Sequence, residues 1–291
     1  MVMKLSLPLA ISLLALAALA SAQQPATNFQ WPEGKQVALS LSFDDARASQ
    51  VERGAALLDR YNVKATFYVM PSGVERKLAG WRKVVASGHE IANHTLNHPC
   101  SGNIAWSRNN SLENYTLERM RQELLGANRR IQELLGVTPE SFAYPCGQTF
   151  VGRGVDARSY VPMVASLFVS ARGGSGKMPA DPARIDFSQL AAVDSDGKDF
   201  KQIFRIVETA KQSGSWVVLA GHDMGEDGEQ TTRLAMLEEL IRYAQNPANS
   251  VWIAPVGRVA QYVHAQRRKK IQSTKPGQPE AFRLQPRGQP R

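Results

Sequence analysis

Residues 37–45 read VALSLSFDD, an alternating apolar run that ends in two adjacent carboxylates. The run has the length and the alternation of a buried strand, and the acidic pair stands at its exit. Residues 91–98 read IANHTLNH and place two imidazoles four residues apart, while residues 216–222 read WVVLAGH and end in a third. Three of the five His residues therefore follow strand-like runs, as does the acidic pair. We predict that these strand ends meet at one site.

One carboxylate and two imidazoles leave open positions on a divalent ion, which is typical of a catalytic metal site. One of the two aspartates can bind the ion while the other stays beside it as a base. A structural zinc site is closed, usually by several Cys ligands, and Cys100 and Cys146 form no CxxC pair. Taken alone, Asp-Asp is often a turn or a helix cap, and His-x3-His is more often two ordinary histidines. The combination of segments favours the metal site.

Strand-like runs alternate with helical patterns along the chain, which argues for parallel strands with crossover helices. A body of about 240 residues suits one domain with a sizeable core. Residues 108–114 and 173–176 are predicted to be surface loops. The predicted strands are 37–43, 65–69, 90–92, 141–144, 167–170, 190–193, 217–219 and 251–253. The predicted helices are 117–135, 202–212, 232–244 and 256–264.

The chain resembles the NodB-type polysaccharide deacetylases, metal-dependent hydrolases that remove acetyl groups from amino sugars or sugar esters. The resemblance covers about residues 37–263 and implies an α/β fold, an irregular seven-stranded (β/α) barrel in a single domain. In such a barrel the catalytic residues lie at the C-terminal ends of the strands. The segments similar to the family's five motifs are 42–45 (SFDD), 88–99 (GHEIANHTLNHP), 142–147 (FAYPCG), 194–196 (DSD) and the segment ending at 222–223 (HD).

The resemblance implies a division of labour between the two aspartates. Asp44 would be the general base, and Asp45 would hold one divalent ion together with His94 and His98. Zinc is the expected metal, with cobalt, manganese, nickel and iron as alternatives. The ion would polarise the acyl carbonyl and lower the pKa of a water.

The resemblance also implies an acid and a cleft wall. His222, oriented by Asp196, would protonate the leaving amine or alcohol. Tyr144, Pro145 and Cys146 would form the wall, with the backbone N–H of Cys146 holding the oxyanion.

Two positions depart from the family pattern. Ala143 stands where the third motif commonly has an Arg that steadies the base, so the base must be held otherwise. Ala220 stands where the fifth motif commonly has a Leu that lines a pocket for the acetyl methyl, and Leu219 comes one residue earlier. The acyl pocket is therefore expected to be wider or differently shaped.

The N-terminal residues predict export. Lys4 precedes an apolar stretch to Ala20, and Ala20-Ser21-Ala22 is a small-residue cleavage site, so residues 1–22 have the pattern of a removable secretory signal. The protein is expected in the periplasm or outside the cell, without a lipoprotein or transmembrane anchor. In that oxidising setting Cys100 and Cys146 are candidates for one disulfide, with independent thiols or a Cys metal ligand as alternatives.

The formal charge of +9 lies in one part of the chain. Residues 23–264 hold 26 basic and 25 acidic side chains, whereas residues 265–291 hold eight basic and one acidic. The last segment is also rich in Pro and Gln, which predicts a disordered basic tail. Such a tail could contact anionic envelope polymers or lipid headgroups, and a merely solvated tail is the alternative. A nearly neutral body argues against a nucleic-acid partner, and we expect a monomer.

These observations favour an exported metal-dependent hydrolase that removes acetyl groups from N- or O-acetylated polysaccharide, acting on a non-peptide carbon–nitrogen bond in the first case. A metal-dependent amidase for a non-sugar amide would use the same residues. A non-catalytic glycan-binding barrel would need neither Asp44 nor His222. A non-haem iron oxygenase also uses two His and a carboxylate, but it would not need the extra base and the distant acid.

Overall fold

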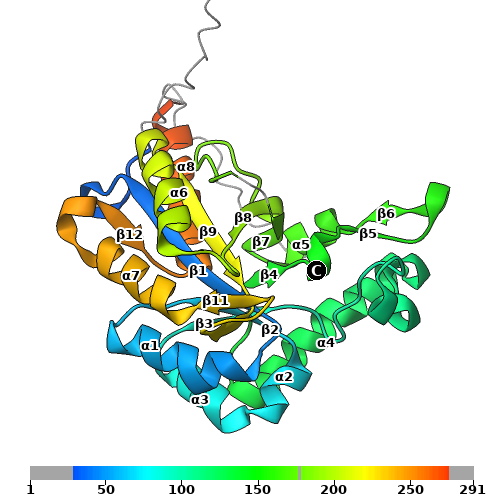
Figure 1. Cartoon of the computed structure of the whole chain (residues 1–291). Helices are drawn as coiled ribbons and strands as arrows, with labels where there is room; N and C mark the ends of the chain where they lie inside the picture. Colours follow the sequence, from blue (N-terminus) through cyan, green and yellow to red (C-terminus); the bar gives the residue numbers. More distant parts are fainter. Residues whose placement is uncertain (1–28, 176–177, 275–291) are drawn as a thin grey trace, which may run out of the picture.

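The computed structural model describes residues 29–175 and 178–274 (Figure 1). The predicted signal peptide and residues 275–291 of the predicted tail lie outside the described residues. In the two described ranges, no helix combines the length and the apolar character needed to cross a bilayer.

The fold is a closed barrel of seven parallel strands in a single domain, as the resemblance implies. Each strand pairs with the next in chain order, and the last, β9, pairs back along the first, β1, which closes the ring. The short strand β12 (Val251–Ile253) pairs with the first residues of β1, and β2 pairs with the last residues of the same edge. The barrel strands are β1 (Val37–Asp44), β2 (Thr66–Val69), β3 (Glu90–Asn93), β4 (Ser141–Ala143), β7 (Ser170–Ser175), β8 (Leu190–Asp194) and β9 (Trp216–Gly221).

Alternation along β1 sets the inside and the outside of the barrel. Val37, Leu39, Leu41 and Phe43 belong to the largest apolar cluster, which lies between the strands and the surrounding helices. The residues between them face the opposite side, because successive side chains of a strand alternate. The last of these is Asp44, which therefore reaches the mouth of the barrel from inside.

Helices surround the barrel (Figure 1). The longest predicted helix, 117–135, is confirmed: Thr116 caps its start by accepting a bond from the Arg119 N–H, and Gly136 ends it with a φ of 73°. The helices are α1 (Ala55–Arg60), α2 (Pro71–Arg76), α3 (Leu78–Ala86), α4 (Leu117–Leu135), α5 (Val161–Leu167), α6 (Phe200–Ser213), α7 (Leu234–Gln245) and α8 (Val256–Thr274). The remaining strands form two small pairs outside the barrel, β5 (Phe150–Val151) with β6 (Arg158–Ser159) and β10 (Asp223–Gly225) with β11 (Thr231–Arg233).

The predictions around β7 are wrong in two respects. Residues 167–170 are not a strand, because α5 runs to Leu167 and the strand begins only at Ser170. Residues 173–175 are not a loop, because they belong to β7. β4 pairs with β7 only as far as Arg172, and β8 pairs with Arg172 and again with Ser175. The two glycines lie in the register shift between these pairs, where glycine is often found within a strand.

The predicted end of the last helix, at His264, is also wrong. α8 continues to Thr274, so the first ten residues of the predicted tail are helical. Arg267 anchors this extension: it donates to the carbonyls of Pro182 and Ile185 and lies over the ring of Phe187. Arg, Lys and Gln are also good helix formers, which a reading of charge alone overlooks.

Candidate functional site

The predicted catalytic and metal-binding residues come together in one cleft of about 870 Å³ at the C-terminal ends of the barrel strands. Asp44 and Asp45 stand at the end of β1, and His94 follows β3 directly. His222 follows β9, and Asp196 lies two residues beyond β8. This arrangement brings together side chains that are up to 178 positions apart in the sequence.

Asp45, His94 and His98 present three ligand atoms to one point. Asp45 Oδ1 lies 3.5 Å from Nε2 of His94 and 3.5 Å from Nε2 of His98, and the three ligand atoms are all within 4.8 Å of one another. Oδ1 is buried and has no hydrogen-bond partner. A buried carboxylate oxygen without a partner, facing two imidazole nitrogens, is what a divalent cation site needs. The residues present therefore fit a metal ion such as zinc.

The electrostatics of Asp45 agree with this geometry. Burial pushes the pKa of Asp45 upwards, but the neighbouring His94 and His98 outweigh it, so the pKa lies below its usual range. The carboxylate is thus charged and able to bind a cation without first losing a proton.

Backbone and neighbouring side chains orient His94. Its Nδ1 lies 2.9 Å from the carbonyl oxygen of Ala143. Since a carbonyl only accepts, Nδ1 carries the hydrogen and Nε2 presents its lone pair to the cleft. Glu123 holds the turn that follows His94, accepting from the backbone N–H groups of Leu96 and Asn97.

Three residues at the site have unusual backbone angles. Asp45, Thr95 and His98 all have positive φ, at 75°, 67° and 49°. Such values are uncommon for residues with a side chain, and they persist where the surrounding structure enforces them, as at functional sites.

Asp44 is held by an arginine that the sequence analysis missed. Its Oδ1 accepts a bond from Arg172 Nη2, and both side chains are buried. Burial raises the pKa of Asp44, but Arg172 and then His94 lower it, and the net pKa is below its usual range. Arg172 is the residue of β7 aligned with Ala143 of β4. The guanidinium absent at position 143 is therefore supplied from the neighbouring strand at the same height.

His222 is paired with Asp196. Nδ1 of His222 lies 2.6 Å from Asp196 Oδ2, and the His222 backbone N–H donates to the other oxygen, Oδ1. Thr232 also donates to Oδ1, at 2.7 Å, which fixes the carboxylate. Burial lowers the pKa of His222, but Asp196 raises it, followed by Asp44, so the net pKa is above the ordinary histidine value.

The predicted cleft wall is present in part. Cys146 lines the cleft with a positive φ of 53°, and Tyr144 also lines it while its hydroxyl donates to the Ser188 carbonyl. Pro145 is buried and is not among the lining residues. Ala220 lines the cleft, whereas Leu219 belongs to the core.

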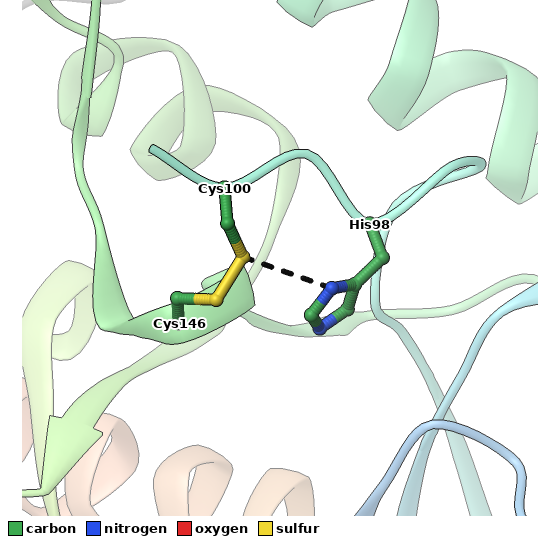
Figure 2. A group of neighbouring side chains, drawn as sticks. All are labelled: His98, Cys100 and Cys146. Atoms are coloured by element: carbon green, nitrogen blue, oxygen red, sulfur yellow. Dashed lines mark hydrogen bonds between the residues drawn. A yellow bond between two sulfur atoms is a disulfide. The ribbon is translucent and has the colours of Figure 1, made fainter. Parts of the chain in front are cut away.

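A disulfide joins Cys100 to Cys146, with the sulfurs 1.97 Å apart (Figure 2). It links the wall to the segment that bears His98, and Cys100 Sγ lies 3.7 Å from His98 Nδ1. Burial and then His94 lower the pKa of His98 to about 4. His98 is therefore neutral near pH 7, which is the form that binds metal. In this arrangement both sulfurs are used in the bond, so neither is a free ligand.

Trp106 is a further cleft residue without a sequence prediction. Its side chain lines the cleft and is 65% exposed, and its ring centroid lies 5.7 Å from that of His98. A large apolar ring exposed beside a polar centre offers a flat binding surface.

The polysaccharide deacetylase family model matches residues 32–156. The chain is 26% identical over 110 residues to peptidoglycan-N-acetylglucosamine deacetylase PgdA of Listeria monocytogenes, covering 38% of this chain and 21% of that protein. The chain spans less than half the length of the curated relatives it matches.

Two solved structures have the same fold. One, from Mycobacterium smegmatis and assigned to the polysaccharide deacetylases, has a TM-score of 0.62 at 20% identity, covering 84% of this chain and 95% of its own. A family 4 acetyl xylan esterase from Clostridium thermocellum in complex with a cobalt ion has a TM-score of 0.51 at 19% identity, covering 79% and 91%.

Proposed function

We propose that this chain, whose residues 32–156 match the polysaccharide deacetylase family model, hydrolyses acetyl groups from an acetylated polysaccharide, breaking the carbon–nitrogen bond of an N-acetylated sugar. One observation carries the proposal. A base paired with an arginine (Asp44) and a histidine paired with a carboxylate (His222) share one cleft with a set of three metal-type ligands. Binding a glycan requires none of these groups, whereas hydrolysis of an amide uses each of them.

We propose that Asp45, His94 and His98 hold one divalent ion through Oδ1 and the two Nε2 atoms. Two imidazole nitrogens and one carboxylate oxygen suit zinc and leave positions open for substrate and water. Bound there, the ion supplies Lewis-acid activation of the acyl carbonyl and of water.

The proton transfers belong to the chain's own residues. Asp44 accepts the proton of the attacking water, and Arg172 keeps its carboxylate ionised and fixed in place. His222 then donates a proton to the departing nitrogen, which is too basic to leave as an anion. Asp196 holds the Nδ1 hydrogen of His222, so Nε2 is the atom that delivers the proton. The backbone N–H of Cys146, by analogy with the family, faces the oxyanion.

The exposed ring of Trp106 supports a glycan over a non-sugar amide. A sugar ring has an apolar face that packs on an aromatic side chain, and Trp106 lies at the cleft beside a proposed metal ligand. An acetylated ester could enter the same cleft, and its alcohol depends less on proton donation by His222.

We further infer that the protein is exported, with residues 1–22 removed and the catalytic domain beginning near Gln23. This rests on the signal pattern of the sequence and agrees with a disulfide between Cys100 and Cys146, because such bonds persist in oxidising compartments. The remaining basic tail would then meet anionic polymers of the cell envelope, and the domain would act as a monomer.

The direct test is release of acetate from a panel of substrates. Chitin oligomers and peptidoglycan fragments report N-deacetylation, acetylated xylan reports O-deacetylation, and a simple aromatic acetamide represents a non-sugar amide. We expect the N-acetylated glycans to be turned over, and His222→Ala to lose the amide substrates more completely than the ester. Turnover of the acetamide alone would contradict the glycan assignment. No turnover of any substrate by the zinc-loaded protein would favour the glycan-binding alternative.

A further inference from the structure

Arg47 contacts both ends of the site. Arg47 follows Asp45 by two residues, and its half-buried side chain lines the cleft. Its Nε and Nη2 donate to Asp45 Oδ2 at 3.1 and 2.9 Å, and its Nη1 donates to Asp223 Oδ2 at 2.7 Å. Nη2 also donates to Gln230 Oε1 at 2.6 Å. Asp223 is the residue directly after His222, so one guanidinium connects the end of β1 with the end of β9.

The next residues along the chain reinforce the same connection. Ser49 donates to Asp223 Oδ1 at 2.6 Å and accepts from the Met224 backbone N–H. Gln50, which is fully buried, donates to the backbone carbonyls of Asp44 and His222 at 2.6 and 2.8 Å. The side chains of Arg47, Ser49 and Gln50 thus bind both the end of β1, at Asp44 and Asp45, and the segment that begins at His222.

Arg47 is not arranged as a substrate-binding cation. Its three nitrogens already donate to two carboxylates and one amide oxygen, and the carboxylates balance its charge. The two N–H groups on Asp45 both bind Oδ2, while Oδ1 is the oxygen that faces the two imidazoles. The two bonds to Oδ2 therefore fix the carboxylate with its other oxygen turned towards His94 and His98.

We propose that Arg47 is a positioning residue that presents Asp45 to the metal and, through Asp223, couples metal binding to the strand end that carries His222. The inference rests on the proposed metal site. Partners of a ligating carboxylate orient it, and their loss typically weakens metal affinity about 10–100-fold. The coupling requires the planar fork of arginine, because a lysine ammonium is a point charge that cannot bridge two carboxylates in the same way.

The experiment measures Zn²⁺ affinity of the metal-free protein by competition with a chromogenic chelator, so it does not depend on turnover. We expect Arg47→Ala to weaken the affinity about 10–100-fold. Arg130→Ala is the matched control. Arg130 also pairs with two carboxylates, Glu75 and Glu133, but on the outer face of the molecule, and its loss should leave the affinity within twofold.

Two conservative variants distinguish the loss of the Arg47 contacts from a loss of charge and from a loss of folding. Arg47→Lys keeps the charge and should still weaken binding several-fold, while Asp223→Asn should weaken binding although Asp223 touches no proposed ligand. The double variant Arg47→Ala/Asp223→Asn should bind no more weakly than Arg47→Ala alone, since both act through one contact.

Two outcomes overturn the inference: wild-type affinity in folded Arg47→Ala or Arg47→Lys, and additive losses in the double variant. A wild-type protein that binds no Zn²⁺ would remove the proposed metal site and, with it, the role of Arg47. Wild-type binding without acetate release would instead count against the proposed substrate and leave the role of Arg47 standing.

Discussion

Asp44 and Arg172 form a buried ion pair whose members come from strands β1 and β7. The sequence predicted the carboxylate and the need for a partner, because Ala143 replaces the expected arginine. It did not predict the partner, since the alignment of Ala143 with Arg172 depends on how β4 and β7 pair. The sequence pattern does not define that register, and Arg172 precedes residues 173–176, a Gly-rich stretch that the sequence predicts to be a loop.

The relocation of the arginine can be tested by moving it back. Arg172→Ala should lower kcat about 100-fold or more, because a general base contributes roughly 10²–10⁴-fold and loses its orientation here. Adding Ala143→Arg to that variant should restore part of the rate, since position 143 lies beside position 172 in the paired strands. Zn²⁺ content serves as the control and should stay near wild type. Unchanged kcat in Arg172→Ala would show that Asp44 does not depend on the arginine.

Substitutions of the two adjacent aspartates should have different effects. Asp44→Asn should abolish turnover while keeping its metal, whereas Asp45→Asn should lose both, because only Asp45 Oδ1 faces the two imidazoles at 3.5 Å. Elemental analysis of the purified variants, alongside acetate release, decides the matter. Metal loss in Asp44→Asn with retention in Asp45→Asn would exchange the two roles.

The pairing of His222 with Asp196 predicts a pH effect. The pKa of His222 is raised, so the acid form persists above the pH at which an ordinary histidine loses its proton. Asp196→Asn removes the largest raising influence, and burial then lowers the pKa. The alkaline limb of the kcat/KM profile should therefore move to lower pH, with kcat reduced by roughly 10²-fold or more. The acid limb, which depends on Asp44, should stay in place. An alkaline limb that stays in place would show that Asp196 does not raise the pKa of His222.

Among the secondary-structure elements, those with strong local signals were predicted and those set by packing were not. Residues 117–135 have a cap, an apolar face and a terminal glycine, and the helix has the predicted bounds. The short helices α1, α2, α3 and α5 were missed, because six to nine residues give too little periodicity. The extension of α8 to Thr274 depends on contacts of Arg267 with a distant loop, which no local pattern reveals.

The disulfide connects the loop after β3 with the turn after β4. Its members are 46 positions apart, and closing such a loop removes chain entropy worth on the order of 4 kcal/mol in the unfolded state. Reduction should lower the unfolding midpoint and also the activity, because the bond holds the wall against the segment bearing His98. Thiol counting on unfolded, unreduced protein should find no free thiol. Two thiols per chain in exported material would rule the bond out.

The whole fold was the most predictable level. Alternating strand and helix patterns indicate a parallel α/β architecture, and the motif resemblance narrows it to the seven-stranded barrel that the structure contains. The site followed because parallel strands end at one face, so residues after β1, β3, β8 and β9 must meet there. Two residues that hold this site together were not predicted. Arg47 binds Asp223, which is 176 positions away, and Arg172 binds Asp44, which is 128 positions away.

Removing the metal should lower the stability of the entire domain. The proposed ion would bind the folded arrangement of Asp45, His94 and His98, and a ligand that binds only the folded state stabilises it by about 4 kcal/mol at a thousandfold excess over its Kd. Chelation should therefore lower the melting temperature, and Zn²⁺ should restore it. His98→Ala is the control, and its melting temperature should not respond to chelator. Equal responses in both proteins would place the bound metal elsewhere.

The 46-position loop closed by Cys100 and Cys146 also makes the domain tolerant of a cut chain. Arg108 is exposed within that loop, so trypsin can cleave there without freeing either product. The two pieces would migrate as one band on a non-reducing gel and as two after reduction. The loop thus offers a place to divide the polypeptide, or to insert a reporter peptide, while a covalent tether keeps both walls of the cleft in one molecule.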